Sequence, residues 1–83
     1  MELYFSGGGE VATLIIDRVN KLLQISSTKT GNEIISAEWK NLFDKGKEEE
    51  QDKKADKLND KDFARIIILT MQTHGYELDK LKW

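Results

Sequence analysis

The sequence predicts a mainly α-helical fold: a small compact domain of three to four helices with an extended N-terminal arm. Two observations predict this class. Residues 62–75, DFARIIILTMQTHG, hold the densest apolar run of the chain between residues that start and stop helices. Residues 10–25, EVATLIIDRVNKLLQI, place apolar side chains three and four positions apart, the period of an amphipathic helix. The alternative is an α+β fold, in which a short strand at 2–6 pairs with 33–36.

The composition indicates one small soluble domain. Its 83 residues, 39% of them hydrophobic, can form one modest core. The absence of cysteine excludes disulfides, zinc–thiolate sites and thiol catalysis. A net charge of −2 is not the basic footprint of a nucleic-acid binder, so nucleic acid is not an expected partner. No segment approaches the ~20 apolar residues of a membrane span and no signal peptide is recognisable, so we expect a cytoplasmic protein with no membrane contact.

Residues 1–9 are predicted to be an arm outside the domain at 10–83. MELYFS alternates weakly between apolar and polar residues, and three glycines then interrupt it. The segment also resembles the remnant of a protease-site tag followed by a linker. A glycine loop before a helix can bind phosphate, but no Gly-Lys-Ser/Thr follows and Glu10 would repel an anion. We therefore interpret the glycines as a flexible joint.

Three helices are expected in the remaining chain. The first spans 10–25, the second spans 37–45 after a Ser36 cap, and the third spans 60–74. The charged segment 47–59 fits either an exposed helix or a linker, because its Glu and Lys residues lie four apart but it has few apolar anchors. The apolar positions of the three helices form the predicted core: Leu14, Ile15, Val19, Leu22, Leu23, Trp39, Leu42, Phe43, Phe63, Ile66, Ile67 and Met71.

No catalytic, metal or cofactor motif is present, and we expect a protein that is not an enzyme and carries no cofactor. His74 is the only histidine, and its place before Gly75 suits the negative end of a helix dipole. The carboxylates lie in polar, charge-mixed sequence that lacks the apolar surroundings needed to shift an acid–base pair.

Part of the chain resembles EF-hand calcium-binding proteins. TKTGNEIISAEWKNLF is similar to a loop and its exiting helix, with Thr28, Thr30, Asn32 and Ser36 at the side-chain ligand positions. A second segment, DKLNDKDFARIII, is similar to the end of another loop, where Asp62 would be the only good carboxylate ligand. The resemblance implies a divergent domain that no longer binds calcium, because that ion needs several oxygen ligands.

Two further functions come from other classes. The first is a helix–turn–helix nucleic-acid binder, although the helix at 60–74 offers only Lys61 and Arg65 as cations. The second, which we favour, is a non-enzymatic module that binds a protein partner and possesses the size and composition of small phage or microbial regulators and inhibitors. Self-association is a further expectation, because 83 residues cover so apolar a helix poorly. Aromatic and leucine side chains near the chain ends are the predicted partner-binding residues: Tyr4, Tyr76, Leu78, Leu81 and Trp83.

Overall fold

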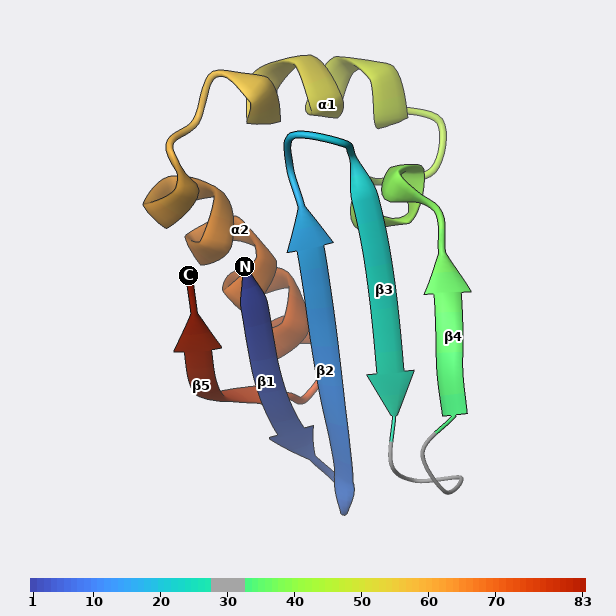
Figure 1. Ribbon diagram of the computed structural model, residues 1–83, viewed down its shortest axis with the longest axis vertical. Coiled ribbons are helices and arrows are strands. Elements are labelled where there is room, and N and C mark those ends of the chain that lie inside the picture. Colours follow the sequence, from blue (N-terminus) through green and yellow to red (C-terminus); the bar gives the residue numbers. More distant parts are fainter. Residues whose placement is uncertain (28–32) are drawn as a thin grey trace.

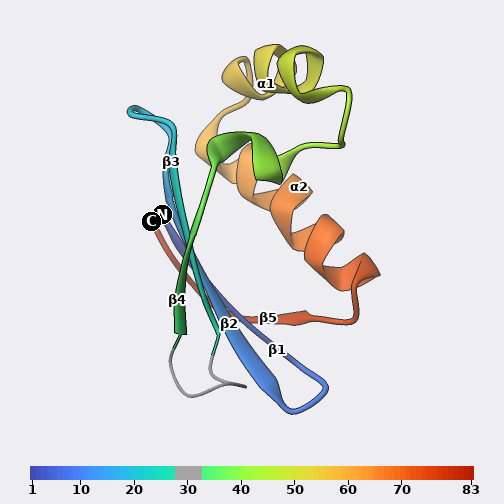
Figure 2. The same cartoon turned by 90° about the vertical axis from the view of Figure 1, so that its right-hand side faces the viewer.

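The protein has an α+β architecture, so the prediction of a mainly helical fold is wrong. The computed structural model describes residues 1–27 and 33–83, with 33–37 described by their backbone alone. A five-stranded antiparallel sheet has the order β4-β3-β2-β1-β5, and two helices cover one of its faces (Figure 1, Figure 2). The strands are β1 Glu2–Gly7, β2 Glu10–Asp17, β3 Leu22–Ser27, β4 Glu33–Ala37 and β5 Glu77–Lys82. The helical elements are the 3-10 helix η1 Trp39–Leu42, α1 Glu48–Asp56 and α2 Asp60–Thr73.

The N-terminal segment is an inner strand of the sheet and does not form an arm. β1 pairs with β2 on one side and with β5 on the other, and its Leu3 and Phe5 are fully buried. The glycines after it form a tight β1–β2 turn in which Gly8 and Gly9 have positive φ. The alternative fold named the observed class, but its pairing of 2–6 with 33–36 is wrong, because β2 and β3 lie between β1 and β4.

Residues 10–25 form a β-hairpin in place of the predicted helix. Ala12, Leu14 and Ile16 point alternately toward the core, which is the two-residue period of a strand. The turn is built by Asp17, whose Oδ1 accepts hydrogen bonds from the backbone N–H groups of Val19 and Asn20 at 3.1 Å each. Such an Asx turn reverses the chain where the helix prediction required continuity.

The hairpin removes three residues from the predicted core. Ile15 faces away from the helices and is exposed, as is Leu22 at 60%. Val19 lies in the turn and is 91% exposed. Helical spacing had grouped these side chains with Leu14 and Leu23, but in strands they alternate to the opposite face or leave the sheet.

The third predicted helix is α2, and it matches the sequence closely. The Asn59 side chain accepts a hydrogen bond from the Asp62 backbone N–H at 2.8 Å, which caps the first turn. Gly75 follows the helix with φ +86°. The second predicted helix is reduced to the short η1, whereas the charged segment forms α1.

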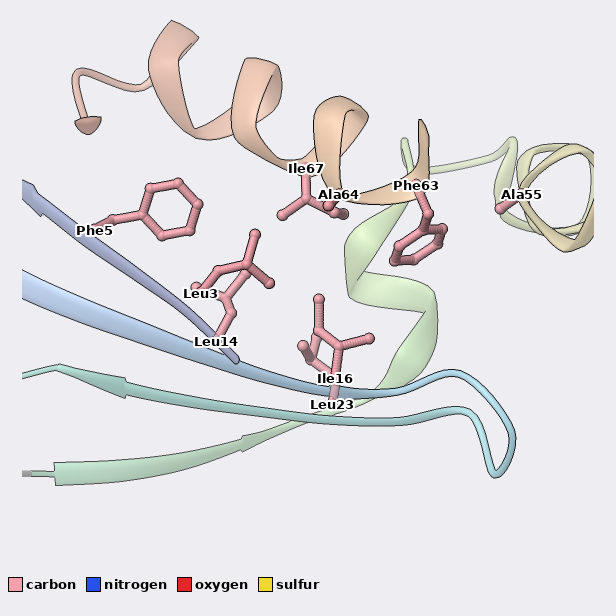
Figure 3. Close-up of a cluster of buried hydrophobic side chains, with 9 residues drawn as sticks. All are labelled: Leu3, Phe5, Leu14, Ile16, Leu23, Ala55, Phe63, Ala64 and Ile67. Atoms are coloured by element: carbon pink, nitrogen blue, oxygen red, sulfur yellow. The ribbon is translucent and has the colours of Figure 1, made fainter. Parts of the chain in front are cut away.

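The core lies between the sheet and α2 (Figure 3). Strand side chains meet the inner face of α2, where Phe63, Ala64 and Ile67 are buried. Ile66, also predicted as core, is 50% exposed, because α2 packs on a single sheet and no other helix or strand of the described residues covers its outer side. The buried cluster comprises Leu3, Phe5, Leu14, Ile16, Leu23, Ala55, Phe63, Ala64 and Ile67. Trp39, Leu42, Phe43 and Met71, predicted as core, are half-buried against it.

The β2–β3 turn is bound to the junction between α1 and α2. Arg18 pairs with Asp60 at 2.7 Å and donates to the carbonyl oxygens of Ala55 and Leu58 at 2.9 and 2.8 Å. Lys21 donates to Asp52 at 2.9 Å. Within the described residues, no helix is long and apolar enough to span a membrane.

Candidate protein-binding surface

Three of the five predicted partner-binding residues face the interior. Leu78 and Leu81 lie on β5 and pack against the buried cluster, as does Tyr76 just before the strand. The Tyr76 hydroxyl donates to Glu10 Oε2 at 2.5 Å, and this bond raises the pKa of Tyr76. The C-terminal segment therefore folds back onto the sheet through β5, and these side chains stabilise the fold.

The other two predicted residues lie on different parts of the surface. Tyr4 is on the sheet face opposite the helices, where its hydroxyl donates to Glu2 at 2.9 Å. Trp83 is 66% exposed and lies near Val19 at the end of the sheet that carries the β2–β3 turn. The structure does not bring the five residues together into one site.

The helical segments enclose a different site, which sequence reasoning did not identify. A cavity of about 280 Å³ opens between η1, α1 and α2. We call it the helical hollow and define it by its lining residues, which are Leu42, Phe43, Asp44, Gln51, Lys54, Ala55, Leu58, Phe63, Ile66, Ile67 and Thr70. Seven of these eleven side chains are apolar, so the hollow offers a nonpolar surface with few polar groups at its margin.

Aromatic contacts position two walls of the hollow. Trp39 stacks on Phe63 with ring centres 5.9 Å apart and planes 10° apart, and meets Phe43 edge-on at 6.2 Å. Offset and edge-to-face arrangements of this kind stabilise aromatic pairs. Trp39 therefore links Phe43, from the segment after η1, to Phe63 of α2.

A pair of hydrogen bonds joins α1, another wall of the hollow, to the segment that follows η1. The Asp44 backbone N–H donates to Gln51 Oε1 at 2.8 Å, and Gln51 Nε2 donates to Asp44 Oδ2 at 2.9 Å. The segment that follows η1 is thereby held against α1. Since both ends of the contact belong to the lining, the hollow is preorganised before anything binds to it.

Charged groups behind the hollow hold α1 in place. Asp52 accepts hydrogen bonds from Lys21 Nζ at 2.9 Å and from Trp39 Nε1 at 3.0 Å. Both bonds lower the pKa of Asp52, and the bond from Lys21 has the larger effect. The same lysine contact raises the pKa of Lys21. These contacts stabilise the position of α1, and Lys21, Trp39 and Asp52 do not line the hollow.

The outer side of α2 extends the apolar surface beyond the hollow. Ile66 lines it and Leu69, one turn further along the helix, is 55% exposed. Large exposed aliphatic side chains beside an apolar cavity are typical of surfaces that bind another protein. Several lining residues were predicted as core, but nothing in the sequence indicated that they surround a cavity.

Other sequence-based hypotheses find little geometric support. Thr28, Thr30 and Asn32 of the EF-hand resemblance lie outside the described residues, and Ser36 belongs to β4. The segment before α2, expected as the second loop, is the helix α1. Across residues 1–27 and 38–83, whose side chains the structure describes, no group of three or more acidic or histidine side chains could hold a metal ion.

Two further hypotheses from the sequence concern His74 and a helix–turn–helix. The His74 ring is exposed, and its Nδ1 lies 2.8 Å from the Thr70 carbonyl oxygen, a contact that closes the end of α2. η1 is a single short turn, too short for the first helix of a helix–turn–helix.

Comparisons of the chain with protein-family models, with curated proteins and with solved structures found no match.

Proposed function

We propose that the protein is a non-enzymatic interaction module that binds an apolar segment of a partner protein in the helical hollow. The observation that carries the proposal is the preformed apolar cavity between η1, α1 and α2, continued on the surface by Ile66 and Leu69. Recognition of an amphipathic segment in an apolar groove is a common mode of peptide binding.

The size of the hollow supports a protein side chain as the occupant. Pockets for drug-sized molecules and cofactors usually measure about 300–1,000 Å³. At about 280 Å³ the hollow falls just below this range. One or two large apolar side chains of a partner suit it better, with Leu69 contacting the adjoining turn of the bound segment.

Polar groups at the margin would orient the bound segment. Lys54 and Asp44 lie on the lining with opposite charges, and Thr70 adds a hydroxyl whose Oγ1 donates to the Ile66 carbonyl oxygen at 3.0 Å. Asp44 is already bonded to Gln51, so Lys54 is the charged group more available to a partner, and as a cation it would pair with a carboxylate. Lys54 lies 3.5 Å from Glu50 in an exposed pair that costs little to break.

The test uses a displayed library of random peptides selected on the wild-type protein. We expect the enriched peptides to share two or more large apolar residues and to lose binding to Ile66→Glu, which places a charge in the hollow. Gln72→Glu is the matched control, because it introduces the same charge at an exposed α2 position outside the lining. Peptides that bound both variants equally, or a selection that enriched none, would contradict the proposal.

A further inference from the structure

The sheet face opposite the helices carries an ordered pattern of side chains. Strand pairing places residues in rows across β5, β1, β2 and β3, and paired residues share a face. One outer row contains Lys82, Glu2, Ile15 and Gln24. The middle row contains Lys80, Tyr4, Thr13 and Ser26, and the third contains Glu77, Ser6 and Val11. Figure 2 shows that no helix lies over this face.

The pattern is complementary to itself. Two sheets that pack face to face lie about 10 Å apart with their strands within about 30° of each other. If a two-fold axis crosses the strands at the middle row, the first row of one copy lies opposite the third row of the other. Lys82 then faces Glu77 of the second copy and Ile15 faces its Val11, each contact occurring twice.

We propose that this open face, defined by the three rows, binds a second copy of the same chain in that antiparallel arrangement. Val11 and Ile15 are exposed, and β-branched side chains on a pleated face pack well against each other. A two-fold axis along the strands would instead place β5 over β4 and would leave Lys82 without Glu77. The charge pattern therefore selects one orientation.

The area indicates a weak and reversible dimer. Four strands about 4.8 Å apart and about six residues long present a face of roughly 400 Å². Two such faces bury less than the roughly 1,200–2,000 Å² of stable interfaces. We expect dimers only at high protein concentration, with an association that weakens as salt is added. This surface is separate from the helical hollow, so either proposal can fail alone.

Charge reversal tests the arrangement by sedimentation of the full chain over a concentration series. Glu77→Lys and Lys82→Glu should each weaken dimerisation about tenfold, because each converts two attractive contacts into two repulsive ones. The double variant should regain the wild-type association. Glu49→Lys, an exposed reversal on α1, is the control and should have no effect.

The two positions differ in their effect on the stability of the monomer, which allows that effect to be distinguished from a change in dimerisation. Lys82 lies beside Glu2 in the same chain, so Lys82→Glu also affects the monomer, whereas Glu77 lies beside Ser6. Because the Glu2 contact stays repulsive in the double variant, restored association cannot come from restored folding. A strictly monomeric wild type at millimolar concentration, or a double variant as weak as the singles, would overturn the proposal.

Discussion

The guanidinium carbon of Arg18 lies 4.5 Å from the centre of the Phe63 ring. This cation–π contact joins the β2–β3 turn to the first turn of α2, and the same guanidinium binds the end of α1. Phe63 in turn stacks on Trp39 and lines the helical hollow. One side chain from the sheet layer therefore contacts α2 and the end of α1, two of the elements that line the hollow.

Replacement of Arg18 by Ala should destabilise the fold by about 2–3 kcal/mol, measured as the free energy of unfolding in urea. The variant leaves the carbonyl groups of Ala55 and Leu58 without their charged donor and removes the contact with Phe63. The ion pair with Asp60 adds little, since that carboxylate is largely exposed.

Two further variants control this measurement. Arg65→Ala removes the same side chain from an exposed position of α2 and should change the unfolding free energy by less than about 0.5 kcal/mol. Arg18→Lys keeps the charge but lacks the planar fork that reaches two carbonyls, so its stability should fall between the wild type and Arg18→Ala. Equal stability of Arg18→Ala and Arg65→Ala would show that the contact does not organise the helices.

Gly7 is the position where the sheet tolerates no side chain. A Cβ atom there would lie 2.4 Å from the Gly75 carbonyl oxygen, at the turn between α2 and β5. The atoms that this Cβ would meet are all backbone, which limits relaxation, so Gly7→Ala should cost about 1–3 kcal/mol of unfolding free energy. Gly8→Asn is the control, because nothing lies near that position and asparagine accepts its positive φ. If both variants melted at the wild-type temperature, the close approach of the β5 turn to β1 would be wrong.

The sequence predicts α2 correctly but not the hairpin at 10–25, because the apolar residues of the hairpin repeat at the spacing of a helix. α2 has a cap at Asn59, a stop at Gly75 and a length that no strand of this sheet reaches. In residues 10–25, two consecutive strands happen to repeat apolar residues at helical spacing. The turn between them has no glycine, and Lys21 adopts φ +54°. The Asp17 turn was the available signal.

The helical hollow was beyond prediction for a different reason. Its walls come from segments that are up to 28 positions apart in the chain, Leu42 to Thr70, and meet only through packing. Phe43, Phe63 and Ile66 were predicted as core residues, but a sequence pattern does not distinguish a filled core from a cavity. Of the predicted C-terminal anchor, β5 turns Leu78 and Leu81 toward the core, whereas Trp83 is exposed.

Acid should weaken the attachment of the hairpin to α1. Lys21 and Trp39 lower the pKa of Asp52 by hydrogen bonding, so its stabilising effect is present above the unfolded pKa, about 3.9, and is lost as the pH falls through the lower folded value. Asp52→Asn should lower the free energy of unfolding by about 1 kcal/mol at neutral pH and should reduce the loss of stability in acid. Urea unfolding at several pH values measures both effects.

The remaining acid dependence of that variant has a second source. Hydrogen bonds from Asn20 lower the pKa of Asp17 in the β2–β3 turn, and this effect persists in Asp52→Asn. Asp79→Asn, at an exposed position of β5, is the control and should retain the wild-type profile. An Asp52→Asn protein that lost as much stability in acid as the wild type would exclude the Asp52 contacts as the cause.

Alkaline titration should show both tyrosines ionising above the ordinary tyrosine pKa of about 10. Hydrogen bonds to Glu10 and Glu2 raise the pKa of Tyr76 and Tyr4, because each hydroxyl donates to a carboxylate. The stabilisation is therefore present below the unfolded pKa and is lost as the pH rises through the higher folded value. Glu10→Gln should lower the pKa of Tyr76, measured from tyrosinate absorbance in a Tyr4→Phe background, where Tyr76 is the one tyrosine left. An unchanged titration in Glu10→Gln would mean that the bond joining β2 to the start of β5 does not form in solution.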